Sequence, residues 1–309
     1  MIAPIALFVF SRVNHTRDTL ISLKNNHLAD RTDLIIFSDG PCDMEDEVKV
    51  MEVRKLIKSV VGFKSVKIVE REINYGLARN IIDGVTAVCA EYGRVIVMED
   101  DIVVSPIFLT YMNQGLDYYS DDDRVISIHG YVYPMKTKLP ETFFLRGADC
   151  WGWATWSRGW KSFNPDGKYL LKEIKRLKLN KLFNFNNSFN YMRGLAAQVK
   201  GKNDSWAVRW HASAFLNNKL TLYPGHSLAK NIGFDSSGRH SGTSNVFDTE
   251  LNVSNVKIGD IKIEDSEIAR KAFEAFFREH KLNPSQFRHI VSSLIPKRLK
   301  NILRKYLRG

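Results

Sequence analysis

The first 130 residues alternate short apolar runs with longer segments of helical period, and this alternation constrains the fold more than any other feature. It is typical of βαβ units, which build a mostly parallel sheet flanked by helices. We therefore expect an α/β fold that binds ligands outside the carboxyl ends of its strands. The predicted strands are 5–10, 34–38, 66–70, 95–98 and 125–128, and the predicted helices are 14–26, 45–60, 77–92 and 106–119. Ser105 is the predicted cap of the fourth helix, with Pro106 in its first turn.

The composition is that of a globular protein with an excess of positive charge. The chain has 309 residues, 44% of them hydrophobic, which excludes a mostly disordered chain. Its net charge of +11 indicates a polyanionic partner. Residues 296–309 hold much of that excess, with six Lys or Arg and no acidic residue.

Three cysteines, Cys42, Cys89 and Cys150, are widely spaced and form no CxxC pair. Neither a disulfide framework nor a zinc site is indicated, which favours a reducing cytoplasm. The apolar start lacks a positive n-region and a cleavage site, and no run approaches the roughly 20 apolar residues of a membrane span.

Three adjacent carboxylates, Glu99, Asp100 and Asp101, follow a predicted buried strand in the segment "RVIVMEDDIVVSP". Like charges repel, so the arrangement costs stability unless a cation or hydrogen-bond donors compensate. An exposed acidic turn is the ordinary interpretation. At the carboxyl end of a strand, however, oxygen ligands suit Mg²⁺ or Mn²⁺ shared with a diphosphate.

Four segments resemble motifs of glycosyltransferases with the GT-A fold. "VIVMEDDIVVSPIFLTYM" resembles the Glu-Asp-Asp form of the Asp-X-Asp signature in the N-acetylglucosaminyltransferase I type. "FSDG" and "NYGLARN" resemble segments of bacterial family-2 sugar transferases, and "CWGWATWSRGW" and "NIGFDSSGRHSG" resemble bacterial relatives in polysaccharide assembly. The likeness spans about residues 3–245, and it implies a Rossmann-like GT-A fold and sugar transfer from a nucleotide-diphosphate donor, with a UDP-sugar expected.

The resemblance also implies roles for single residues. Asp101 binds a Mn²⁺ or Mg²⁺ ion, and Asp100 and Glu99 face the ribose and the transferred sugar. Asp39 contacts uracil or ribose, with a turn-stabilising role as the alternative. Arg12 and Arg79 neutralise phosphate or steady the nucleotide pocket, although Arg79 is equally well interpreted as a surface charge. His240 is a possible further ligand of the metal or diphosphate, with Arg239 as another partner for phosphate.

Inverting transfer needs one carboxylate that takes the proton of the acceptor hydroxyl. Asp204 in "KNDSWAVRW" is the first candidate and Asp149 the second. An acidic helix cap is the alternative role for Asp204. Exchange of Asp204 for Asn should then abolish transfer.

All six tryptophans lie between residues 151 and 210. Sugars pack their C–H faces on aromatic rings, so we expect Trp153 to contact the donor sugar and Trp206 the acceptor. Core packing is the expected role of the other four.

The sequence predicts a GT-A domain over 1–245, with a nucleotide-sugar half at 1–130 and an acceptor half at 131–245. An extension follows at 246–309, in which 296–309 has the pattern of a basic amphipathic helix suited to an anionic leaflet. Packing of that helix on its own domain is the alternative. We expect a peripheral protein on the inner face of the cytoplasmic membrane, acting on a glycan or lipid-linked acceptor.

Three other functions remain open at this point. A sugar-nucleotide nucleotidyltransferase shares the sheet and an acidic metal site, but "SRVNHTR" lacks the Gly-rich phosphate loop expected after strand one. A nucleic-acid-binding protein fits the basic charge, yet no recognised motif is present, so we expect no nucleic-acid partner. A non-catalytic nucleotide-binding protein is the third alternative.

Overall fold

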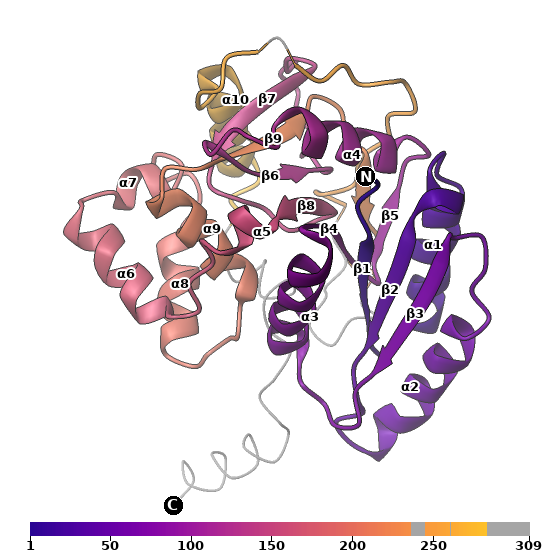
Figure 1. Ribbon diagram of the computed structural model, residues 1–309. Coiled ribbons are helices and arrows are strands. Elements are labelled where there is room, and N and C mark those ends of the chain that lie inside the picture. Colours follow the sequence, from indigo (N-terminus) through magenta and orange to yellow (C-terminus); the bar gives the residue numbers. More distant parts are fainter. Residues whose placement is uncertain (236–244, 260, 283–309) are drawn as a thin grey trace, which may run out of the picture.

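The computed structural model describes residues 1–235, 245–259 and 261–282, and an eight-stranded sheet crosses this part of the chain (Figure 1). Its strands are β1 (Ile5–Val9), β2 (Asp33–Ser38), β3 (Ser65–Glu70), β4 (Arg94–Glu99), β6 (Val125–His129), β7 (Thr142–Arg146), β8 (Trp153–Trp156) and β9 (Leu220–Pro224). The order is β3-β2-β1-β4-β8-β6-β9-β7, in which only β8 and β7 run against the other six. The prediction of a mixed, mostly parallel sheet flanked by helices is confirmed.

A second, two-stranded sheet and the helices complete the described fold. The short strands β5 (Ile102–Val104) and β10 (Ala229–Asn231) pair antiparallel directly after the acidic triplet. The helices are α1 (Val13–Lys24), the 3-10 turn η1 (Ala29–Arg31), α2 (Met44–Ile57), α3 (Leu77–Tyr92), α4 (Phe108–Tyr118), α5 (Ser157–Trp160), α6 (Gly167–Arg176), α7 (Asn180–Phe183), α8 (Tyr191–Val199), α9 (Trp206–Leu216) and α10 (Glu267–Glu279). In Figure 1, α1 and α2 cover one face of the parallel strands and α3 lies on the other, while α6 to α9 form a separate group of helices.

The predicted strands and helices of the first 130 residues all exist, with ends shifted by a few residues. The expected cap of the fourth helix was wrong. The helix begins at Phe108 with Ile107 at the N-cap position and no side-chain cap, while the Ser105 hydroxyl accepts the Ile107 N–H at 3.4 Å and donates to the carbonyl of Asn252 at 2.6 Å. The Ser105 hydroxyl thus bonds to a residue far away in the sequence, which the local sequence pattern could not predict.

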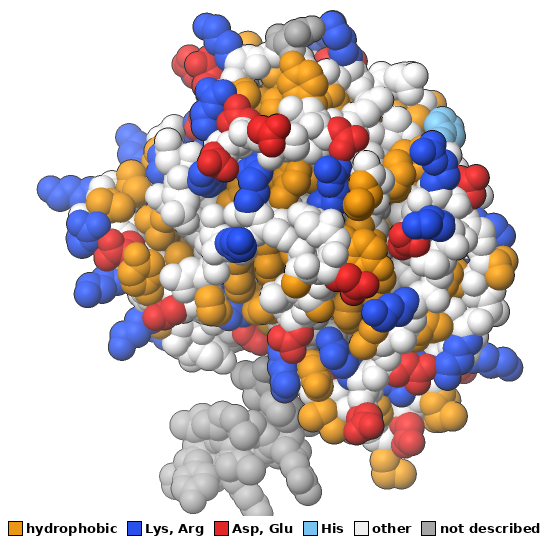
Figure 2. Space-filling model, viewed as in Figure 1, with side chains coloured by type: hydrophobic (Ala, Val, Ile, Leu, Met, Phe, Trp, Pro, Cys, Tyr) orange, Lys and Arg blue, Asp and Glu red, His pale blue; other side chains and the backbone are white. Residues whose placement is uncertain are grey.

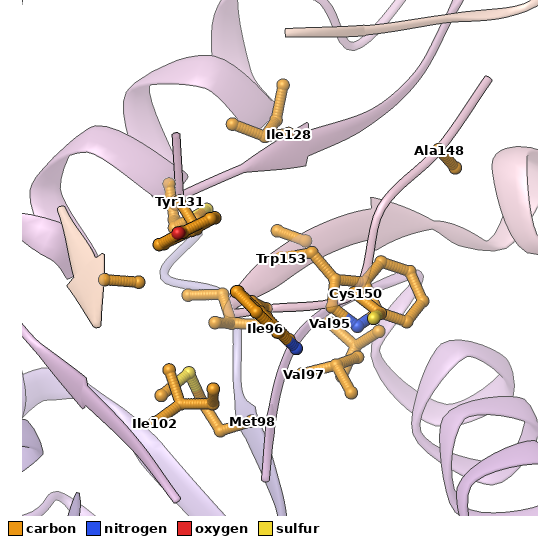
Figure 3. Close-up of a cluster of buried hydrophobic side chains, with 14 of the residues drawn as sticks. Val95, Ile96, Val97, Met98, Ile102, Ile128, Tyr131, Ala148, Cys150 and Trp153 are labelled. Atoms are coloured by element: carbon orange, nitrogen blue, oxygen red, sulfur yellow. The ribbon is translucent and has the colours of Figure 1, made fainter. Parts of the chain in front are cut away.

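Buried side chains of β4 form part of the core, and Figure 3 shows Val95 and Val97 beside Trp153, with Met98 beside Ile102. The described part of the predicted C-terminal extension belongs to the same core, because Phe273 and Phe277 of α10 pack with it. The predicted helix 296–309 lies outside the described residues. Among the residues that are described, no helix has both the length and the apolar character that crossing a membrane requires.

Candidate functional site

The carboxyl ends of the four parallel strands are level with one another. Val9 pairs with Ser38, Ser38 with Glu70, and Phe8 with Glu99. The order of the strands reverses between β1 and β4. Strands β2 and β3 lie on one side of β1, and β4 lies on its other side. Such a reversal leaves a crevice at the strand ends where open α/β sheets bind ligands.

Arg12 and the acidic triplet meet at this reversal point. The Arg12 guanidinium, just after β1, forms ion pairs with Asp100 and with Asp101, the latter at 2.9 Å. The Thr19 hydroxyl of α1 donates to the Asp100 carbonyl at 2.9 Å and holds the turn in place. The sequence-predicted residues Arg12, Glu99, Asp100 and Asp101 are therefore brought together, and Arg12 has carboxylates as its partners in this structure.

The charges of this cluster do not balance. Burial raises the pKa of Glu99 well above its usual value, and the charges of Asp101 and Asp100 add to that rise while Arg12 opposes it. Burial also raises the pKa of Asp100, against the effect of Arg12. Three carboxylates face one guanidinium, so a further cation stabilises the ionised cluster.

The ligand chemistry of the cluster fits Mn²⁺ or Mg²⁺ only in part. Carboxylate oxygens are the ligands that these hard cations prefer, and Asp101 is partly exposed. Within the described residues, however, no group of three or more His, Cys, Asp or Glu side chains is placed to hold a metal ion. Phosphate oxygens and water normally complete a magnesium site that has only one or two protein carboxylates.

The segment after β10 covers the cluster. Ile232 donates its N–H to the Asp101 carbonyl at 2.8 Å, and a Cβ on Gly233 would lie 2.3 Å from an Asp101 carboxylate oxygen. A side chain at residue 233 would therefore displace the Asp101 carboxylate. Two residues later, Asp235 contacts His15 of α1 at 3.2 Å. The predicted ligands His240 and Arg239 lie outside the described residues.

Asp39, at the end of β2, holds a loop. Its carboxylate accepts the N–H groups of Gly40, Tyr75 and Gly76 at 2.8 to 2.9 Å and the Asn74 amide at 3.2 Å. Burial raises the pKa of Asp39, and these backbone donors oppose the rise. The turn-stabilising alternative is thus what the contacts show, while a contact with uracil or ribose stays a prediction.

Two arginines lie on the ring of Tyr75 beside that loop. The Arg79 guanidinium is 3.9 Å from the ring centroid and the Arg71 guanidinium 4.6 Å. Arg79 is exposed and also contacts Asp83 at 3.5 Å. Its surface position agrees with the ordinary interpretation, and it still lies at the edge where a nucleotide would bind.

The loop before β8 brings Asp149 to the same edge. Trp153 pairs with Val97 in antiparallel register, so the residues just before Trp153 lie beside Glu99 at the end of β4. Burial raises the pKa of Cys150, and the charges of Asp149, Glu99 and Asp101 raise it further. Asp149 is partly exposed, and its carboxylate accepts the Cys150 N–H at 2.9 Å and a hydrogen bond from the Cys150 thiol.

Buried aromatic and imidazole side chains surround the Asp149 loop. The loop contacts both histidines: His129 accepts the Trp151 N–H at 3.1 Å, and His211 bonds the Ala148 carbonyl at 2.8 Å. Burial lowers the pKa of His129 and lowers that of His211 to about 4, so both are neutral near pH 7. Four tyrosines, of which three are buried and Tyr191 is partly buried, have a pKa raised first by burial and then by the Asp149 charge: Tyr131, Tyr133, Tyr191 and Tyr223.

Asp204 lies elsewhere, in the helical group. It pairs with Arg209 at 3.0 Å, and Ser205 rather than Asp204 caps α9. Burial raises the pKa of Asp204 and Arg209 opposes the rise. Among the described residues, no recorded contact or charge interaction joins Asp204 to Glu99, Asp100 or Asp101.

Trp153 and Trp206 are core residues, which corrects their expected contact with sugars. Their exposed fractions are 0% and 1%, and their rings stack with centroids 5.7 Å apart. Trp210 and Trp160 pack on the same group. Rings so enclosed have no surface to offer a substrate, and they fix α9 against β8 instead.

Nothing in the sequence indicates that Arg71 and Tyr75 contact each other beside the candidate site, although the segment "NYGLARN" contains Tyr75. Nor does the sequence point to Arg54 of α2, whose guanidinium bonds the Arg71 carbonyl at 2.7 Å and joins the ends of β2 and β3. A basic residue on a helix has many possible partners, so its contact could not be read from spacing.

No family model and no curated protein matches this chain. Among solved structures it is similar to S. aureus TarS, at 9% identity and a TM-score of 0.36, over 52% of this chain and 30% of that one. It is also similar to the mannosyltransferase PcManGT from Pyrobaculum calidifontis in complex with GDP-Man and Mn²⁺, at 10% identity and a TM-score of 0.34, over 57% and 47%. TarS 1–349 in complex with UDP-GlcNAc matches at 9% identity and a TM-score of 0.34, over 56% and 47%.

The chain thus spans less than half the length of each of these structures. A likeness this distant supports neither the fold nor an activity, so both rest on the topology and residues of this chain.

Proposed function

We propose that the protein is an inverting, metal-dependent glycosyltransferase of the GT-A type. It moves a sugar from a nucleotide-diphosphate donor, a UDP-sugar first of all, to a hydroxyl of a glycan or lipid-linked acceptor. The observation that carries the proposal is the under-neutralised cluster of Arg12 and Glu99 to Asp101 at the reversal point between β1 and β4.

The donor's diphosphate is the anion this cluster can take together with a cation. Asp101 is the partly exposed carboxylate that would hold Mn²⁺ or Mg²⁺, with Asp100 held in place by Arg12 beside it. The metal supplies Lewis-acid stabilisation of the charge that develops on the leaving diphosphate. Arg12 is within reach of the same phosphates, since its guanidinium already lies against Asp101.

Asp149 is our choice of general base in place of Asp204. It lies at the edge that holds the triplet, it is partly exposed, and in the described part of the chain its carboxylate accepts hydrogen bonds from Cys150 alone. In the proposed step the acceptor oxygen bonds to the anomeric carbon as the bond from that carbon to the diphosphate breaks. The hydroxyl proton passes to Asp149, and the nucleoside diphosphate leaves.

A panel of UDP-sugars and sugar acceptors with Mn²⁺, followed by mass spectrometry, tests the proposal. We expect a glycosylated product and free UDP, both lost in Asp101→Asn and retained in the exposed control Asp18→Asn. Formation of UTP from a UDP-sugar and pyrophosphate would instead identify a nucleotidyltransferase. No reaction with any donor, together with no nucleotide binding, would refute the proposal.

A further inference from the structure

One region of the surface carries far more positive charge than the rest of the described fold. Residues 161–202, here called the helical lobe, comprise α6, α7 and α8 with their connections and hold ten Lys or Arg against two acidic residues. All ten basic side chains are exposed. Figure 2 shows blue side chains projecting along the left edge, where Figure 1 places α6 and α7.

The two acidic residues of the lobe are both used locally. Asp166 caps α6 by accepting the N–H groups of Lys168 and Tyr169 at 2.9 and 3.0 Å. Glu173 pairs with Arg176 at 2.8 Å. Of the ten basic residues of the lobe, only Arg176 forms a salt bridge within the described residues. The field of the other nine is not compensated by the protein itself.

A helix elsewhere shows that this is not the general pattern. α2 is also amphipathic and exposed on one face, yet its fourteen residues hold four acidic and three basic side chains. Like charges gathered on one surface oppose folding through mutual repulsion. The lobe is therefore arranged for a negative partner at some cost to stability.

Apolar side chains are exposed among these charges. Tyr169 is 50% exposed, Leu177 45% and Val199 36%, while Leu170 and Ile174 of α6 face the interior. Lys and Arg around exposed Tyr and Leu on a helix are what binds the boundary between lipid headgroups and acyl chains. Eight of the ten basic residues of the lobe are Lys. A lysine ammonium is a compact charge, whereas the planar guanidinium of Arg is the group that forms paired hydrogen bonds with nucleic acid.

We propose that the helical lobe is a docking surface for an anionic lipid bilayer. It is distinct from the predicted helix 296–309, and it revises the expectation that the excess charge belongs largely to that segment. The inner side of the lobe reaches the candidate site, because Tyr191 at the start of α8 stacks on His211 with ring centroids 4.4 Å apart, and His211 bonds the carbonyl of Ala148, the neighbour of Asp149. If the proposed function is correct, the docked lobe would present a bilayer-attached acceptor to Asp149. The docking itself does not depend on the proposed function.

Cosedimentation of the full chain with vesicles tests the proposal. The probes are phosphatidylcholine vesicles with and without phosphatidylglycerol. The lobe variant carries Lys168→Gln, Lys172→Gln and Lys175→Gln together, all exposed on α6. The control carries Lys49→Gln, Lys55→Gln and Lys262→Gln, exposed lysines elsewhere, and has the same net charge.

We expect the wild-type chain to prefer the anionic vesicles. Each lysine near an anionic leaflet contributes enough that the lobe variant should lose at least about tenfold in affinity. The control should stay close to wild type, and the corresponding triple Lys→Arg variant should bind normally. Because every variant retains residues 296–309, that segment contributes equally throughout.

Equal losses in the lobe and control variants would overturn the proposal, as would equal binding to neutral and anionic vesicles. A difference between the variants in binding to single-stranded RNA, with none for vesicles, would replace the bilayer by a nucleic acid. The vesicle result does not depend on turnover, so it separates a failure of docking from a failure of the proposed transferase activity.

Discussion

The two halves of the molecule hold their polar groups in different ways. In the parallel half, which holds the strands β1 to β4, Arg12 forms ion pairs with carboxylates and Asp39 accepts hydrogen bonds from backbone N–H groups. These residues lie at strand ends that are level with one another. From β6 onwards, buried polar side chains lie among aromatic rings, and Nδ1 of His129 and Nε2 of His211 have no hydrogen-bond partner among the described residues. The strand ends position the polar side chains of the first half, and packing against aromatic rings positions those of the second half.

That difference assigns different sensitivities to the two halves. Arg12 and Asp101 at the strand ends are partly exposed, so they can exchange partners with a charged ligand. Buried imidazoles and tyrosines position a neighbouring loop and respond to protonation instead. The predictions below test this division, beginning with the largest expected effect.

Asp149→Asn should lower turnover a hundredfold to ten-thousandfold, the usual contribution of a general base. UDP affinity should stay near wild type, since the loop does not hold the nucleotide. Asp204→Asn is the matched control, and it should weaken the ion pair with the buried Arg209 without lowering turnover to the same extent. Steady-state rates and UDP titrations of both variants give the answer. An inactive Asp204→Asn beside an active Asp149→Asn would assign the base to Asp204 instead.

His211 should make the aromatic half sensitive to acid. Burial lowers its pKa in the folded state to about 4, below the usual value of 6.5. Its neutral form is therefore fully compatible with folding above pH 6.5, and stability is lost as the pH falls from 6.5 towards 4. The loss is about 3 kcal/mol of unfolding free energy at the acid end.

Urea unfolding followed by tryptophan fluorescence measures this effect, because all six tryptophans lie between residues 151 and 210. The pH dependence should be flatter in His211→Gln than in the control His226→Gln, which changes an exposed histidine. The same slope in both variants would show that His211 is not the group that titrates.

Asp39→Asn should destabilise the parallel half by about 2 kcal/mol, because an amide cannot accept hydrogen bonds at both of its terminal atoms. The N–H groups of Tyr75 and Gly76 then compete for one oxygen. Thermal unfolding should show the loss beside the exposed control Asp30→Asn. An unchanged melting temperature would mean that the loop is held by other contacts.

Arg79→Ala should have the smallest effect. Stacking of an exposed guanidinium on Tyr75 contributes about 0.5 to 1 kcal/mol to stability. A clear drop in UDP affinity at nearly constant stability would support the nucleotide role, and unchanged UDP affinity would leave Arg79 as a surface charge.

The sequence predicted the elements of the first half well because their signals are local. Apolar runs and helical periods lie within each strand or helix, so 77–92 was placed to the residue. Insertion of β8 between β4 and β6, and the pairing of β5 with β10, depend on segments far apart in the chain. Periodicity carries no record of such pairings.

The site was predicted in part for the same reason. Glu99, Asp100 and Asp101 could be placed from the strand that precedes them, and Arg12 from the end of the first strand. That Arg12 contacts those carboxylates, or that Trp153 and Trp206 bury each other, depends on three-dimensional packing. A tryptophan that could contact a sugar and one in the core have the same local pattern.

Calorimetric titration of UDP into the protein, with and without Mn²⁺, tests the central claim most directly. The account predicts that Mn²⁺ raises UDP affinity in the wild-type chain and has no effect on it in Asp101→Asn. Equal UDP affinity with and without Mn²⁺, or a full Mn²⁺ effect retained in Asp101→Asn, would contradict it.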